Sequence, residues 1–188
     1  MHSLQMSGRR NPVFTIGHST RSVAELIALL GEVAADLVAD VRAFPRSRTN
    51  PQFNGPVLQE ALAEAAIAYC YLPSLGGRRR AGQAPSPNTL WRNESFRAYA
   101  DYAGTGEFRA GLEQLCALAA EHRCAIMCAE AVWWRCHRRI IADYLLTAGF
   151  EVAHILGPGK LTPATLTPGA RRSSGYRLVY PAEPARSA

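Results

Sequence analysis

One short stretch of the sequence carries most of the residue types that could do chemistry. Cys128 and Cys136 lie eight residues apart, with Glu130 between them and with His137 and Arg138 directly after the second cysteine. The second cysteine begins a predicted helix. The unpaired N–H groups and the dipole of a helix N-terminus attract anions and lower the pKa of a nearby thiol. The sequence therefore predicts an anion-binding site that contains a thiol.

Three interpretations of these thiols stay open. In the first, Cys128 or Cys136 is a nucleophilic or redox thiolate that the helix terminus and the neighbouring basic residues activate. In the second, the two cysteines, His137 and His18 bind zinc or iron. Their spacing lacks the close cysteine pairs of a zinc knuckle, so no residue is assigned as a metal ligand and the cofactor stays unknown. In the third, the thiols only fill the core, and their charged neighbours form a structural ion pair.

Polar residues also follow two other predicted strands. His18 and Ser19 come directly after the first strand, and Asp40, Arg42 and Ser47 lie at and beyond the end of the second. The carboxyl ends of parallel strands meet at one edge of a sheet, so we expect these residues to lie near the two cysteines. His18 is a candidate general acid or base. Asp40 and Arg42 share one face of their strand, as a buried pair or as ligands of a substrate.

Aromatic and basic residues lie close to these candidates in the sequence. Trp133 and Trp134 occupy the segment between the two cysteines, where an indole ring could stack on a base or plug the loop. Arg46 and the arginines at 78–80 are candidates for a basic rim. The non-periodic segment 73–93 is a candidate binding loop or lid.

The elements that must position these residues alternate along the chain. Short apolar runs alternate with helical patterns, which is typical of a mostly parallel sheet with crossover helices. Strands are predicted at 13–16, 37–42, 68–72, 124–128 and 152–156, and helices from 23, at 57–66, 96–102 and 108–119, and from about 136 to 148. We predict a flexible N-terminus over 1–12 and a single α/β domain over 13–156. Residues 157–188 form a tail rich in Pro, Gly and Arg, with a short edge strand at 176–180.

Composition limits the class of protein. The chain has 188 residues, of which 48% are hydrophobic, enough for one core. Lys plus Arg total 21 against 15 Asp plus Glu, and Lys160 is the single lysine, so the net charge of +6 rests on arginine. Arginine suits phosphate ligands, although a GC-rich genome would also favour it.

The cysteine count and the apolar segments predict where the protein works. Five cysteines without a scaffold-like spacing indicate reduced thiols, and hence a cytoplasmic location. We find neither a signal peptide nor the ~20 apolar residues that span a membrane, so no membrane association is predicted.

The motifs together resemble a known family. Residues 15–19, Asp40 to Arg42 with Pro45 and Ser47, the turn at 75–77, and Cys128 and Glu130 followed by residues 136–138 are similar to the bacterial domain of unknown function 488 family, over about 13–156. With the order of elements, the resemblance implies a Rossmann-like α/β fold with three α/β/α layers and a mostly parallel five-stranded sheet. The segment at 40–42 is also similar to rhodanese-like sulfurtransferases, but their compact catalytic loop does not follow Cys128.

These observations favour an enzyme that acts on an anionic, phosphate-bearing substrate, a small molecule such as a nucleotide or a nucleic acid. It would be a hydrolase or transferase and could form a homodimer. The candidate catalytic residues are His18, Glu130, Cys128, Cys136 and Asp40. The candidate substrate-binding residues are Ser19, Arg42, Ser47, Trp133, His137 and Arg138. A non-catalytic nucleic-acid-binding or regulatory module is the alternative, and a metal-dependent or thiol-based enzyme is a minor one.

Overall fold

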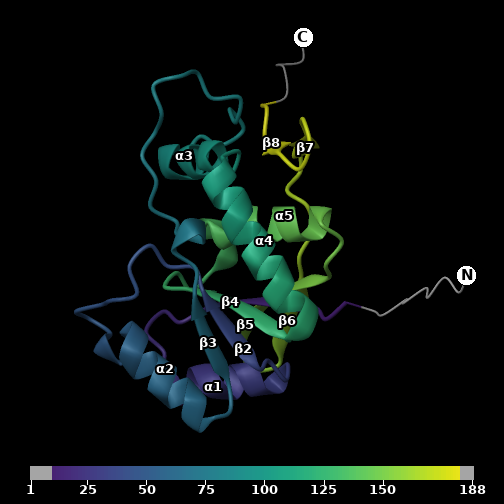
Figure 1. Cartoon of the computed structure of the whole chain (residues 1–188). Coiled ribbons are helices and arrows are strands. Elements are labelled where there is room, and N and C mark those ends of the chain that lie inside the picture. The colour runs from purple at the N-terminus through teal and green to yellow at the C-terminus, as the bar shows by residue number, and fades with distance from the viewer. Residues whose placement is uncertain (1–9, 183–188) are drawn as a thin grey trace, which may run out of the picture.

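The computed structural model describes residues 10–182, which contain five α-helices and a six-stranded sheet (Figure 1). The strands of this sheet are β1 (Val13–Gly17), β2 (Leu37–Asp40), β3 (Ala68–Tyr71), β4 (Cys124–Cys128), β5 (Val152–Gly157) and β6 (Lys160–Pro163). The helices are α1 (Val23–Glu32), α2 (Gly55–Glu64), α3 (Glu94–Tyr102), α4 (Gly106–Glu121) and α5 (Arg138–Thr147). Strands β7 (Arg171–Arg172) and β8 (Leu178–Val179) form a separate ribbon.

The sheet has the strand order β3-β2-β4-β1-β5-β6. Strands β1 to β5 pair in parallel, which confirms the predicted mostly parallel, Rossmann-like α/β fold, and β6 pairs antiparallel to β5. This sixth strand was not predicted, because its four residues are exposed and show no apolar alternation. A tight turn with Gly159 at a φ of 63° returns the chain along β5.

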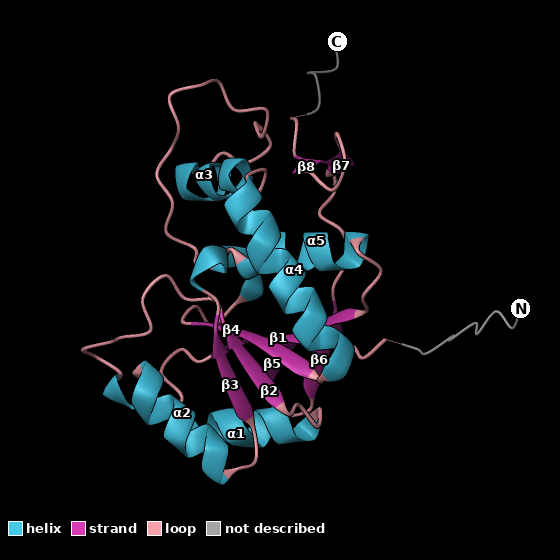
Figure 2. Cartoon of the chain, in the orientation of Figure 1, coloured by secondary structure: helices cyan, strands magenta, loops and turns pink. Residues whose placement is uncertain are grey.

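Helices cover both faces of the sheet (Figure 2). One core contains Leu26 and Leu30 of α1 and Leu58 of α2, packed on Ile16 and other residues of that face. The opposite core contains residues of α3, α4 and α5, Phe108 among them. The alternating faces of the strands therefore both lie under helices, as three α/β/α layers require.

Local signals explain where the helices begin and end. Ser22 and Glu25 form a capping box at the start of α1, where Ser22 Oγ accepts from the Glu25 N–H at 3.1 Å. Gly149 follows α5 at a φ of 86°, a conformation that favours glycine. Within residues 10–182, none of the helices combines the length and the apolar composition that a membrane crossing requires.

The segment after β5 packs on the domain. Tyr180 is fully buried and its hydroxyl donates to Asp143 Oδ2 of α5 at 3.0 Å. Leu178 is buried too, and the strand predicted at 176–180 is β8, which pairs with β7 and not with the main sheet. The predicted flexible N-terminus lies largely outside the described residues, which begin at residue 10.

Candidate functional site

The carboxyl ends of three neighbouring strands open into one cleft. β2, β4 and β1 are adjacent at the centre of the sheet, so the residues that follow them are brought together. The cleft has a volume of about 590 Å³ and includes His18, Arg42, Cys128 and Cys136 in its lining. The structure therefore joins the three groups of polar residues that the sequence placed at the strand ends.

The His18 side chain after β1 is held in a single orientation. Its ring stacks on Phe53, with 4.1 Å between the ring centroids, and is 2% exposed. Nδ1 lies 2.9 Å from the Ser19 carbonyl, which can only accept, so Nδ1 carries the proton and Nε2 is an acceptor. Burial lowers the pKa of His18, and the charge of Arg42 lowers it further despite the Ser19 contact. A neutral imidazole therefore faces Arg42.

The Arg42 side chain after β2 is clamped by Asp40. Arg42 Nε lies 2.9 Å from Asp40 Oδ1, and Nη2 lies 2.6 Å from Oδ2. The Tyr69 hydroxyl donates to the same carboxylate at 2.7 Å. Arg42 Nη1 points away from this pair and lies 3.4 Å from His18 Nε2. Asp40 thus orients Arg42, and Nη1 is the nitrogen that Arg42 presents to the cleft.

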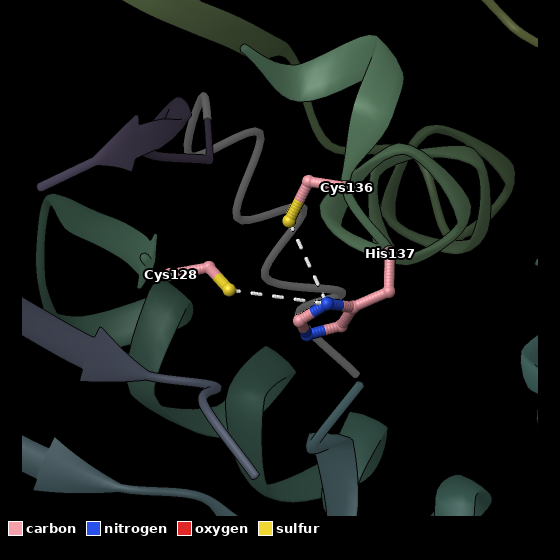
Figure 3. Close-up of side chains that lie close together, drawn as sticks. All are labelled: Cys128, Cys136 and His137. Carbon is pink, nitrogen blue, oxygen red and sulfur yellow. Dashed lines mark hydrogen bonds between the residues drawn. The ribbon is translucent and has the colours of Figure 1, made fainter. Parts of the chain in front are cut away.

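Two sulfur atoms and one imidazole nitrogen meet between β4 and α5 (Figure 3). His137 Nδ1 lies 4.0 Å from Cys128 Sγ and 3.5 Å from Cys136 Sγ. His137 Nε2 lies 2.9 Å from the Val41 carbonyl, so Nε2 carries the proton. The lone pair of Nδ1 therefore points toward both sulfurs. We call these three residues the Cys–His cluster.

The Arg138 side chain lies behind this cluster, at the first turn of α5. It is 1% exposed, its Nε donates to Cys136 Sγ at 3.2 Å, and its Nη2 donates to the Glu130 carbonyl. No carboxylate among the described residues forms an ion pair with it. A buried guanidinium without a carboxylate is stabilised best if the sulfur beside it carries negative charge.

The two thiols differ in acidity. The interaction with Cys136, followed by burial, raises the pKa of Cys128 well above its usual value. Burial alone would raise the pKa of Cys136, but Cys128, His137 and Arg138 together hold it well below its usual value. Cys136 is therefore the more acidic of the two thiols.

Two glycines allow the backbone to approach this site closely. A Cβ at Gly77 would clash with the His137 ring, and a Cβ at Gly17 would clash with the Glu130 carbonyl. Neither glycine has a positive φ, so the requirement is space and not backbone conformation. Because these two glycines have no side chain, the loop at Gly77 can pack against His137, and the end of β1 at Gly17 can pack against the segment after β4.

Arginines dominate the rim of the cleft. Arg42, Arg46, Arg78 and Arg135 line it, against the single carboxylate of Glu130. Glu130 is exposed at the rim. A smaller hollow next to the cleft shares its rim and includes Trp134, which is 48% exposed. The cleft is therefore a cationic concavity with an aromatic side chain beside it.

The structure places most of the predicted residues in the cleft and leaves three behind its wall. The predicted residues that line it are His18, Ser19, Arg42, Ser47, Cys128, Glu130, Cys136 and His137. Asp40 and Arg138 lie behind, where they hold Arg42 and Cys136. Trp133 lies outside the lining and stacks on His154, with 4.3 Å between the ring centroids.

Three aromatic residues that support the site were not predicted. Phe53 stacks on His18, Tyr69 donates to Asp40, and Tyr99 packs edge-to-face with His137, with 4.9 Å between the ring centroids. Tyr69 lies on β3, and alternation with Tyr71 was its only signal in the sequence. Phe53 and Tyr99 do not follow a strand end, which is the signal that identified the other site residues in the sequence.

The arrangement can bind an anion and supply nucleophilic or metal-ligating atoms next to it. Cys128, Cys136 and His137 each offer one ligand atom, and these atoms lie within 4.8 Å of one another. His18, the fourth ligand considered from the sequence, is not part of this group. Its neutral ring instead faces the Arg42 guanidinium.

Comparisons with known proteins add one relationship. A family model described as Domain of unknown function DUF488 matches residues 22–145. No curated protein and no solved structure matches the chain. The matched range includes Asp40, Arg42 and the Cys–His cluster, while His18 precedes it.

Proposed function

The chain belongs to the Domain of unknown function DUF488 family, and from the geometry of its cleft we propose that it is an enzyme that acts on an anionic, phosphate-bearing substrate. The substrate is a nucleotide, another small phosphate ester or a nucleic acid. The observation that carries this proposal is the clamped Arg42, whose Nη1 lies beside His18 Nε2 in the cleft that the Cys–His cluster also lines.

Arg42 is suited to hold a phosphate. Asp40 accepts from Nε and Nη2, so the guanidinium is already ordered and loses little side-chain entropy when a ligand binds at Nη1. Asp40 raises the pKa of Arg42 against the effect of burial, so the group stays charged. A phosphate oxygen at Nη1 would accept a charge-assisted hydrogen bond.

The rim strengthens the same preference. Four arginines and one glutamate line the cleft, and a concave surface of one sign concentrates its field and attracts anions of opposite charge. A phosphate ester would therefore be drawn in with its anionic end toward Arg42.

The remaining lining residues supply the reactive groups. His18 Nε2 has no proton and lies next to Arg42, where it can take a proton from a nucleophile or return it to a leaving group. The Cys–His cluster provides the nucleophilic or metal-ligating atoms. Glu130 is a second proton-transfer candidate at the rim. These roles fit a hydrolase or a transferase.

Binding of inorganic phosphate and of nucleoside monophosphates, measured by calorimetry at low salt, tests the proposal. Arg42→Lys keeps the charge but loses the planar fork, and we expect binding at least tenfold weaker. Arg135→Gln at the exposed rim should weaken it several-fold. Arg109→Gln is the matched control, since Arg109 is 58% exposed and pairs with Glu113 outside the cleft. Equal affinity in all four proteins would reject the cleft as the phosphate site.

A second candidate function is nucleic-acid binding without catalysis. Phe44 and Trp134 are 65% and 48% exposed and lie beside the cationic cleft, as stacking platforms for bases would. Affinity for a single-stranded oligonucleotide should then fall steeply with salt, and Trp134→Ala should weaken it. His18→Asn separates the candidates, because it should abolish turnover but leave oligonucleotide affinity unchanged.

Two further sequence predictions concern the setting of the protein. All five cysteines are free, which supports a reducing and hence cytoplasmic location. The homodimer stays a prediction.

A further inference from the structure

The Cys–His cluster has the donor atoms and the spacing of a metal site. Cys128 comes from the end of β4, and Cys136 and His137 lie directly before α5, with both sulfurs turned toward the imidazole (Figure 3). The Sγ to Nδ1 distances are 4.0 and 3.5 Å. A tetrahedral zinc ion with Zn–S of about 2.3 Å and Zn–N of about 2.05 Å would set its S and N ligands roughly 3.6 Å apart. The cluster therefore needs little movement to enclose such an ion.

The His137 ring is already oriented for ligation. Its Nε2–H donates to the Val41 carbonyl at 2.9 Å, which leaves the Nδ1 lone pair directed at the two sulfurs. Metal-bound histidines in proteins usually make this contact with their second nitrogen, because it fixes both the tautomer and the ring plane. Gly77 and Tyr99 pack against the ring and restrict it further.

The surroundings favour a charged sulfur. Arg138 Nε donates to Cys136 Sγ at 3.2 Å from the buried side, and no described carboxylate pairs with this guanidinium. Two thiolates and a neutral imidazole are the soft and borderline ligands that select zinc over magnesium or calcium.

We propose that Cys128 Sγ, Cys136 Sγ and His137 Nδ1 bind one zinc ion, with a fourth coordination position open to the cleft. All three residues line the cleft, so the open position faces the same space as Arg42 and His18. Three protein ligands with an open position are typical of catalytic zinc sites, whereas structural sites use four. The site itself follows from the cluster alone. Its use in catalysis rests on the proposed function.

Metal analysis of the full chain tests the site directly. The protein is purified under reducing conditions, and its zinc content is measured by plasma mass spectrometry before and after dialysis against a chelator. Zinc is then restored, or Co²⁺ is added in its place. We expect one zinc per chain, and a thiolate-to-cobalt charge-transfer band that saturates at one equivalent of Co²⁺.

Variants show which residues hold the ion. Cys128→Ser, Cys136→Ser and His137→Gln should each weaken zinc affinity at least tenfold. Cys116→Ser is the matched control, because Cys116 is a half-buried thiol on α4 outside the cluster. If a ligand variant does not fold, the cobalt spectrum of the unmodified chain still decides.

Other outcomes overturn the proposal. A folded, reduced chain that binds neither zinc nor cobalt would leave a free thiolate in the cleft. A disulfide between Cys128 and Cys136 in fresh protein, with no metal binding after its reduction, would make the pair a redox site. Zinc binding by all three ligand variants would place the metal elsewhere. Phosphate binding is measured separately, so its absence from a protein that binds zinc would reject the proposed function and leave the metal site standing.

Discussion

Two buried arginines belong to different walls of the same cleft, Arg42 in its lining and Arg138 behind Cys136, and they differ in what neutralises them. Arg42, 4% exposed, is paired with the Asp40 carboxylate through Nε and Nη2. Arg138, 1% exposed, has the Cys136 sulfur and a backbone carbonyl as its partners, and no ion pair with any described carboxylate. One arginine thus has a permanent counter-ion, while the other depends on the state of a thiol.

Because their counter-ions differ, the wall of Arg42 and the wall of Cys136 can do different chemistry. The Asp40 carboxylate holds two nitrogens of Arg42, so the Asp40–Arg42 pair is a fixed frame whose remaining nitrogen, Nη1, can receive an anion. A thiolate can be protonated, oxidised or bound to metal, so the wall of Cys136 and Arg138 can change its chemistry. We infer that the first wall binds and the second reacts.

Removing the permanent counter-ion should have the largest effect. Asp40→Asn leaves the Arg42 charge buried without a partner, and we expect a loss of about 3–5 kcal/mol in the free energy of unfolding. Urea denaturation measures this. Glu113→Gln is the control, because that exposed carboxylate makes a surface ion pair, and its loss should cost about 0–1 kcal/mol. A small effect of Asp40→Asn would show that Arg42 does not need its counter-ion.

Zinc bound at the wall that contains Cys136 should stabilise the folded protein. At a free zinc concentration of about 100 times the Kd, the folded state gains about 2.7 kcal/mol over the metal-free protein. Urea denaturation with and without zinc measures the gain. Asp40→Asn should keep this gain and Cys136→Ser should lose it. A gain that survives in Cys136→Ser would contradict the division between the walls.

Acid should lower the unfolding free energy through His154, a buried histidine that is close enough to Arg138 to feel its charge. Burial, and then the charge of Arg138, lowers the pKa of His154 to about 4 from 6.5. The unfolded chain therefore takes up the proton first, so this contribution is intact above pH 6.5 and is lost as the pH falls toward 4. We expect a loss of about 2 kcal/mol between pH 7 and pH 5.

Substitutions at two histidines test this prediction. His154→Gln should flatten the pH dependence of the unfolding free energy, and His122→Gln, at an exposed position, should not. An unchanged slope in His154→Gln would show that another group governs acid stability.

The smallest effect is expected for Tyr69, which contacts the Asp40–Arg42 pair from β3. Tyr69→Phe removes one hydrogen bond to Asp40 and leaves the contacts of Arg42 intact. We expect a loss of about 1 kcal/mol in unfolding free energy and unchanged phosphate affinity. Weaker phosphate binding in this variant would mean that the tyrosine, and not Asp40 alone, positions Arg42.

The sequence predicted the parts of the site that follow from strand ends. His18, Arg42 and Cys128 come directly after buried strands, and parallel pairing of β1, β2 and β4 brings such positions together. The alternation rule also placed Asp40 and Arg42 on one face, as a buried pair or as substrate ligands, and the structure contains the pair.

The supporting contacts could not be predicted in the same way. The contact of Tyr69 depends on β3 pairing with β2, and strand order is not encoded in hydrophobic periodicity. Phe53 reaches His18 from a short 3-10 helix at Pro51–Phe53, and Tyr99 reaches His137 from α3. The exposed strand β6 has no apolar pattern to detect, and the packing of Tyr180 depends on Asp143 in α5.

The central claim is that Arg42 holds an anion in the cleft, facing the Cys–His cluster. A crystal structure of the full chain grown with inorganic phosphate tests it most directly. The account predicts a phosphate within hydrogen-bond distance of Arg42 Nη1, in the space between His18 and Cys136. Phosphate bound elsewhere, with only water at Arg42, would contradict the account.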